Sequence, residues 1–251
     1  MPSLASSCLL LTLFASCSAS EPAKARPPET LTPEAKVSSE AAAESPTAQE
    51  DKPASVESFV RQTYIHGLAY EDASRYDASV VPALLKILQD PKEESYWSNS
   101  VQMLGIVGDE DVADTIFAFI REDAGAEKLS RDQYAAKSSG ALTALGYLVH
   151  RIGSERALDY LIEGLDPETW QKRVDWTSPY QAASDDRNRQ MTELCVMALA
   201  LSGHPRAGEA LRSLKSEGAR PEMSGLLDEA VATHELIIKE GLKNYYKGRK
   251  N

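Results

Sequence analysis

Cysteine is scarce in this chain of 251 residues, which contains three in all. Cys8 and Cys17 lie in the apolar N-terminal segment, so Cys195 alone remains for the rest of the chain. A single thiol cannot form an internal disulfide, which excludes a fold held together by disulfides. Apolar residues surround Cys195 at helical spacing, a pattern that favours a buried thiol over a catalytic nucleophile.

Basic charge is also in deficit. The chain has 27 Lys and Arg residues against 38 Asp and Glu residues, a formal net charge of -11. Nucleic-acid binding depends on cations that neutralise phosphates, so no nucleic acid is expected as a partner. With 42% hydrophobic and 26% charged residues, the composition is that of a soluble globular protein and excludes collagen-like, wholly disordered and multi-span membrane proteins.

Motifs of the common enzyme classes are missing. The sequence has no HExxH or paired-cysteine zinc motif, no G-x-S-x-G, no Walker A and no G-x-G-x-x-G. Its four histidines are scattered, and His234 falls on the apolar stripe of the last predicted helix, which favours a core position over a metal ligand. We therefore expect a protein that is not an enzyme and holds neither a metal nor a cofactor.

The N-terminus carries a short apolar run, Cys8–Ala15, which is too short to span a bilayer and typical of a signal peptide. The stretch Leu13-Phe14-Ala15-Ser16-Cys17 resembles the lipobox of bacterial lipoproteins. This resemblance implies a signal peptide over residues 1–16 and a lipid anchor on Cys17. Residues 1–16 contain no Lys or Arg, so a plain secretory signal, cut after Ser16 or Ala19 to leave a soluble periplasmic protein, is the alternative.

Residues 17–55 are rich in Pro, Ala, Ser and Glu and contain almost no large apolar side chain. Such a segment cannot bury enough surface to offset chain entropy, so it is expected to be disordered. As a flexible coil it would reach on the order of 30 to 40 Å, which suits a tether between a membrane and a folded domain over residues 56–251.

From residue 56 onward, apolar residues recur three and four positions apart, which predicts helices and no strands. The expected helices span approximately residues 56–68, 77–89, 95–107, 110–122, 131–152, 154–165, 187–202, 205–216 and 222–246. The fold class is therefore predicted to be all-α.

Four segments of the chain align without gaps and share an aliphatic fifth position. They are Val80–Leu88, Val112–Ile120, Ala157–Leu165 and Ala207–Lys215. The first, continued through Pro91 and followed by Ser100-Val-Gln-Met-Leu-Gly-Ile-Val-Gly-Asp-Glu-Asp111, resembles a HEAT repeat of the short class also found in phycobilisome lyases. The resemblance covers roughly residues 76–245. It implies a right-handed α-solenoid of about four HEAT-like helix pairs, with the helix at 56–68 as an N-terminal cap.

The second and third repeats carry insertions at about residues 121–134 and 168–186. Equivalent loops of a solenoid emerge on one edge, so the insertions are expected to form a common rim. Candidate binding residues on this rim are Tyr96, Trp97, Tyr134, Trp170, Arg173, Trp176 and Tyr180. Aromatic and Arg side chains dominate binding hot spots. The alternative is that the aromatic rings pack over the helix ends and only bury area.

Together these features predict a membrane-anchored, non-enzymatic protein-interaction scaffold of the bacterial cell envelope, facing the periplasm. Residues 1–55 contain seven acids and four bases, so eight of the eleven net negative charges lie on residues 56–251 and favour a partner with a basic surface. Ser18 after the anchor cysteine slightly favours the outer membrane. The alternatives are an enzyme or enzyme accessory of the HEAT-like lyase branch and a binder of envelope glycans or peptides. The oligomeric state stays open.

Overall fold

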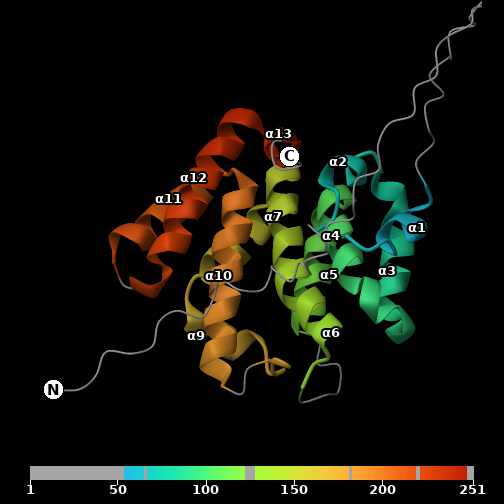
Figure 1. Ribbon diagram of the computed structural model, residues 1–251, viewed down its shortest axis with the longest axis horizontal. Coiled ribbons are helices and arrows are strands. Elements are labelled where there is room, and N and C mark those ends of the chain that lie inside the picture. Colours follow the sequence, from blue (N-terminus) through green and yellow to red (C-terminus); the bar gives the residue numbers. More distant parts are fainter. Residues whose placement is uncertain (1–53, 65–66, 122–127, 181–182, 219–220, 248–251) are drawn as a thin grey trace, which may run out of the picture. The chain divides into compact units, whose positions relative to one another are not determined.

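Figure 1 shows the protein as a computed structural model, which describes residues 54–64, 67–121, 128–180, 183–218 and 221–247. All of them belong to one unit, residues 50–251. The predicted signal peptide, Cys17 and the tether up to residue 53 lie outside the described residues. Across the described ranges the chain is helical and has no strand, apart from one isolated bridge between Lys128 and Thr177. The all-α prediction is confirmed. Among the described helices, none combines the length and apolarity needed to cross a membrane.

The described residues form thirteen α-helices. They are α1 (Val56–Val60), α2 (Tyr70–Ala73), α3 (Val81–Gln89), α4 (Trp97–Val107), α5 (Glu110–Arg121), α6 (Arg131–Ala135), α7 (Ala141–Ile152), α8 (Glu155–Glu163), α9 (Pro167–Arg173), α10 (Ser184–Ser202), α11 (Pro205–Ser216), α12 (Ser224–Glu240) and α13 (Leu242–Lys247). A π-helical segment, Ala136–Gly140, joins α6 to α7. Short 3₁₀ segments, Ala78–Val80, Pro91–Tyr96 and Pro221–Met223, precede α3, α4 and α12.

Helix α2 lies where no helix is expected from the sequence, and three other elements differ from the expected ranges. α1 ends at Val60 instead of residue 68. α9 occupies part of the expected loop at 168–186, because Pro167 stands at its first position and the Asp166 side chain accepts a hydrogen bond from the Glu168 N–H at 3.1 Å. The last expected helix is divided at Gly241, whose φ of 78° lies in the left-handed region that favours glycine.

The longer helices form two layers. α4, α7, α10 and α12 pack side by side in one row, and Figure 1 shows α10 running between α7 and α12. Four further helices pack against this row. Helix α3 packs on α4, α5 on α4 and α7, α8 on α7 and α10, and α11 on α10 and α12. We call α4, α7, α10 and α12 the inner row and α3, α5, α8 and α11 the outer row. The apolar core lies between the rows.

Two glycines bring the inner row to backbone contact. A Cβ atom on Gly105 of α4 would lie 2.2 Å from the carbonyl oxygen of Ala144 in α7. A Cβ atom on Gly146 of α7 would lie 2.5 Å from the carbonyl oxygen of Ala198 in α10. Both distances are shorter than van der Waals contact, and the atoms opposite belong to rigid helical backbone. Side chains larger than hydrogen would therefore separate the helices.

Gly146→Ala is expected to destabilise the protein by about 1 to 3 kcal/mol, because the added methyl group must push α7 away from α10. The measurement is the midpoint of urea unfolding. Gly225→Ala in α12 is the matched control, since a Cβ there meets nothing within 4 Å and alanine favours a helix. Equal midpoints for the two variants would contradict backbone contact between α7 and α10.

Helices α2 and α13, which lie far apart in the sequence, meet over α7. The ring of Tyr147 in α7 lies 5.2 Å from that of Tyr70 in α2, and its hydroxyl lies 2.7 Å from that of Tyr246 in α13. Tyr70 and Tyr246 stack with ring centroids 5.5 Å apart, and Lys247 pairs with Glu71 at 3.4 Å. Burial raises the pKa of Tyr147 well above its usual value. This tyrosine cluster ties the C-terminal helix to α2, a contact that the sequence pattern does not indicate.

Candidate functional site

The two insertions that the sequence places on one rim do lie next to each other in their described parts. The Leu129 N–H donates to the carbonyl of Thr177 at 3.2 Å. The indole N–H of Trp176 donates to the carbonyl of Ile120 at 2.7 Å. The expected juxtaposition is therefore confirmed, and the segments meet where α5 ends and α10 begins.

All three tryptophans are buried, and each covers the end of an outer helix. Trp97, Trp170 and Trp176 are 7%, 0% and 1% exposed. The indole N–H of Trp97 donates to the carbonyl of Ile87 in the last turn of α3 at 2.9 Å. The indole N–H of Trp170 donates at 2.8 Å to the carbonyl of Gly164, the residue that follows α8. The indole N–H of Trp176 donates to the carbonyl of Ile120 in the last turn of α5. The structure thus favours the packing alternative for these three rings, because each is buried and donates its indole N–H to a carbonyl at the end of a helix.

Tyr180 is the one exposed aromatic ring of the predicted rim. It is 60% exposed, and its ring meets the buried Tyr134 edge to face at 5.9 Å. The guanidinium of Arg131 lies 5.6 Å above the Tyr180 ring. The Tyr134 hydroxyl donates to the side chain of Gln190 at 2.6 Å, so the ring that supports Tyr180 is itself fixed. Tyr180 and Arg131 form the accessible part of the aromatic rim.

Tyr96 and Arg173 take intermediate positions. Tyr96 precedes α4, is partly buried and packs against the core. The guanidinium of Arg173 lies 3.8 Å from the centre of the Tyr160 ring, donates to the Tyr160 carbonyl at 2.8 Å and pairs with Glu163. Burial raises the pKa of Tyr160 to about 12, against the opposing effect of the Arg173 charge. Arg173 therefore fixes the end of α8 and offers only an edge to solvent.

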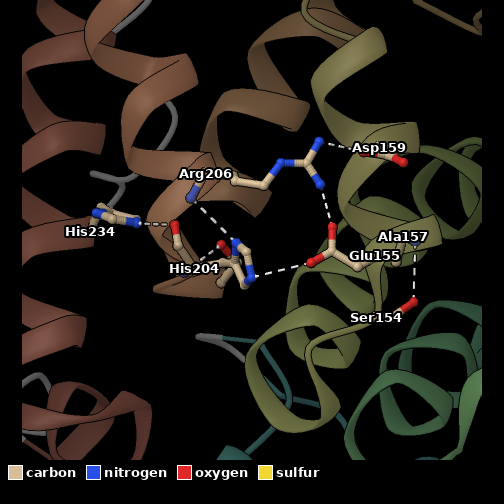
Figure 2. Close-up of polar contacts among 8 residues, drawn as sticks. Ser154, Glu155, Ala157, Asp159, His204, Arg206 and His234 are labelled. Carbon is tan, nitrogen blue, oxygen red and sulfur yellow. Dashed lines mark hydrogen bonds and ion pairs between the residues drawn. The ribbon is translucent and has the colours of Figure 1, made fainter.

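A second polar cluster joins neighbouring outer helices. Arg206, the second residue of α11, pairs with Glu155 and, at 2.7 Å, with Asp159, both in α8 (Figure 2). His204, the N-cap of α11, lies 3.7 Å from Glu155 and accepts a hydrogen bond on Nδ1 from the Arg206 N–H. Figure 2 also shows Ser154 capping α8 by accepting from the Ala157 N–H.

The same contact recurs one helix earlier. Arg156, the second residue of α8, pairs with Asp114 in α5, and the Ser154 hydroxyl donates to Glu110 at 2.9 Å. In the repeat alignment Arg156 corresponds to Arg206, and Asp114 corresponds to Asp159. Both α8 and α11 thus contact the preceding outer helix through equivalent residues.

The chemistry-bearing side chains of the described region stay apart. Within the residues that the structure describes, no three His, Cys, Asp or Glu side chains are grouped so as to hold a metal ion. Cys195 is fully buried, and burial raises the pKa of its thiol well above the usual range, as the sequence pattern predicts for an inert core cysteine. No family model, curated protein or solved structure matches this chain.

His234 is buried, as expected from its place on the apolar stripe of α12. It is 1% exposed, and its Nε2 lies 2.9 Å from the carbonyl of His204. Because a carbonyl accepts, Nε2 carries the proton, and Nδ1 has no hydrogen-bond partner within the described part of the chain. Burial lowers the pKa of His234, the hydrogen bond to His204 opposes this, and Arg212 lowers the pKa further.

The lowered pKa of His234 predicts a loss of stability in mild acid. Below the unfolded pKa of about 6.5, the unfolded chain takes up a proton that folded His234 resists, so the free energy of unfolding falls as the pH drops through this range. His234→Gln should flatten the fall in urea midpoint between pH 7.5 and pH 5.5. His150→Gln removes a different histidine and serves as the control. An unchanged pH slope in His234→Gln would contradict this assignment.

Proposed function

We propose that this chain is a lipid-anchored, non-enzymatic scaffold of a bacterial cell envelope that binds a protein partner. Its helical body is proposed to be a right-handed solenoid of about four HEAT-like helix pairs. The recurrence of the Arg156–Asp114 contact as Arg206–Asp159 supports this architecture, because repeating units make equivalent contacts with their neighbours. Val56, Phe59 and Val60 of α1 are buried, in keeping with a cap packed on α3 and α4.

The observation that carries the binding proposal is the exposure of Tyr180. The Tyr180 ring already contacts the ring of Tyr134 and the guanidinium of Arg131, so it loses little conformational freedom when a partner covers it. The inner row offers less surface, because α2 and α13 meet over Tyr147 of α7. The rim around Tyr180 is therefore the proposed contact surface. The excess of carboxylates on residues 56–251 favours a partner with a basic surface, through electrostatic attraction at longer range.

A photo-crosslinking amino acid placed at position 180 of the full chain, expressed in cells that contain the partner, is expected to give a defined protein adduct. The same amino acid at position 152 is the control, since Ile152 is also exposed, at 41%, but lies at the end of α7. Tyr180→Ala should weaken partner capture roughly tenfold or more and leave the unfolding midpoint nearly unchanged.

Trp176→Ala is expected to lower the free energy of unfolding by about 3 to 5 kcal/mol, because it empties a core position. Tyr180→Ala, in contrast, should affect partner capture and not stability. Equal adducts at positions 180 and 152 would contradict a specific rim surface. Retention on peptidoglycan with no protein adduct would support the glycan or peptide binder in place of the protein scaffold.

The proposed membrane anchor depends on Cys17. Cys17→Ala is expected to move the protein from the membrane fraction to the soluble fraction, because no other acyl chain would hold it there. Mass spectrometry of the membrane-extracted protein should find an acylated N-terminal Cys17. A mature N-terminus at Cys17 or Ser20 without acyl chains would show the plain secretory alternative instead.

A further inference from the structure

Beside the rim lies a pocket with a charge opposite to that of the whole chain. Its volume is about 440 Å³, and it opens between the end of α5, the end of α9 and the start of α10. Its charged lining residues are Arg121, Lys172, Arg173, Arg187 and one acid, Asp175. A volume of this order accommodates a small ligand.

Arg187 is the most unusual member of this set. It is 3% exposed, and its guanidinium donates only to neutral oxygens, the side-chain oxygen of Asn188 at 2.8 and 3.0 Å and the carbonyl of Trp176 at 2.5 Å. These bonds use three of its five N–H donors. No carboxylate of the described region pairs with it, and burial lowers its pKa, while Tyr134 and Asp175 act in the opposite direction. A buried cation without a counter-charge is costly, so an anion would stabilise this site.

The other cations differ in how they are neutralised. Arg173 already pairs with Glu163. Arg121 donates to the carbonyl of Phe117, and neither it nor Lys172 forms an ion pair with a carboxylate among the described residues. Among the described residues, Arg121, Lys172 and Arg187 have no carboxylate partner, and Asp175 is the one carboxylate of the described lining. The described lining therefore has two positive charges in excess, which a phosphate dianion would balance.

The start of α10 adds to the positive electrostatic potential of the pocket. Ser184, the first residue of this 19-residue helix, lines the pocket, and the N-cap Ala183 provides no side-chain hydrogen bond to the first turn. Main-chain N–H groups at a helix start attract anions. The first turn also carries two carboxylates, Asp185 and Asp186, of which Asp186 pairs with Arg189 at 3.0 Å.

We infer that this pocket binds a small phosphate-bearing ligand, with the side chains of Arg121, Lys172 and Arg187 around the phosphate. Guanidinium groups present paired N–H donors that fit phosphate oxygens, and Lys172 adds a point charge at the mouth of the pocket. The inference goes beyond the proposed scaffold and does not depend on it, because the ligand is a small anion instead of a protein surface.

Isothermal titration calorimetry of the full chain with inorganic phosphate at low ionic strength tests this inference. Binding is expected, and Lys172→Gln and Arg121→Gln should each weaken it roughly tenfold, since each removes one charge-assisted contact. Both side chains are exposed, so neither change threatens folding. Lys243→Gln, which removes an exposed charge on α13, should leave phosphate affinity unchanged.

Glycerol phosphate and succinate complete the design. Tighter binding of glycerol phosphate would show that the site takes a phosphate ester, and equal binding would show that it takes free phosphate. The inference is overturned by the absence of phosphate binding, by equal losses in Lys172→Gln and Lys243→Gln, or by succinate binding as tightly as phosphate.

Discussion

Backbone contact between inner helices is the constraint on which the rest of the structure depends. Where Gly105 meets Ala144 and Gly146 meets Ala198, no side chain separates the helices. The close approach of α7 to α10 corresponds to the step between the outer helices packed on them, α5 and α8, where Arg156 pairs with Asp114. The next outer step, from α8 to α11, is joined by Arg206 and Asp159.

The same regularity governs the ends of the outer helices. Each of α3, α5 and α8 leaves carbonyls without an intrahelical partner, and each receives one indole N–H from a residue further along the chain. The insertions that supply Trp170 and Trp176 therefore build the edge of the fold as well as extending it. Because these rings are buried against the helix ends, the aromatic surface left exposed to a partner is small and centres on Tyr180.

Much of the architecture could be predicted from apolar periodicity, since the helices of both layers coincide closely with the expected ranges. The rim could be placed from the insertion lengths, but the depth of its side chains could not. Whether Trp176 faces solvent or Ile120 depends on contacts between segments 56 residues apart, which no local pattern records. Arg156 and Arg206 lie just before two of the aligned segments, at equivalent positions, but the sequence alone does not show which residues they pair with. The pocket around Arg187 likewise depends on three-dimensional proximity.

The tyrosine cluster alters how such a row of helices should come apart. Repeats that touch only their neighbours can fray from either end, and their stability grows by increments. Here Tyr246 and Lys247 hold α13 against Tyr70 and Glu71 of α2, so the last of the described helices closes a loop of more than 170 residues. Helices α2 and α13 can then not separate from the body independently of each other. A body closed by this contact should melt in one cooperative transition and fold slowly, because its closing contacts have a very high contact order.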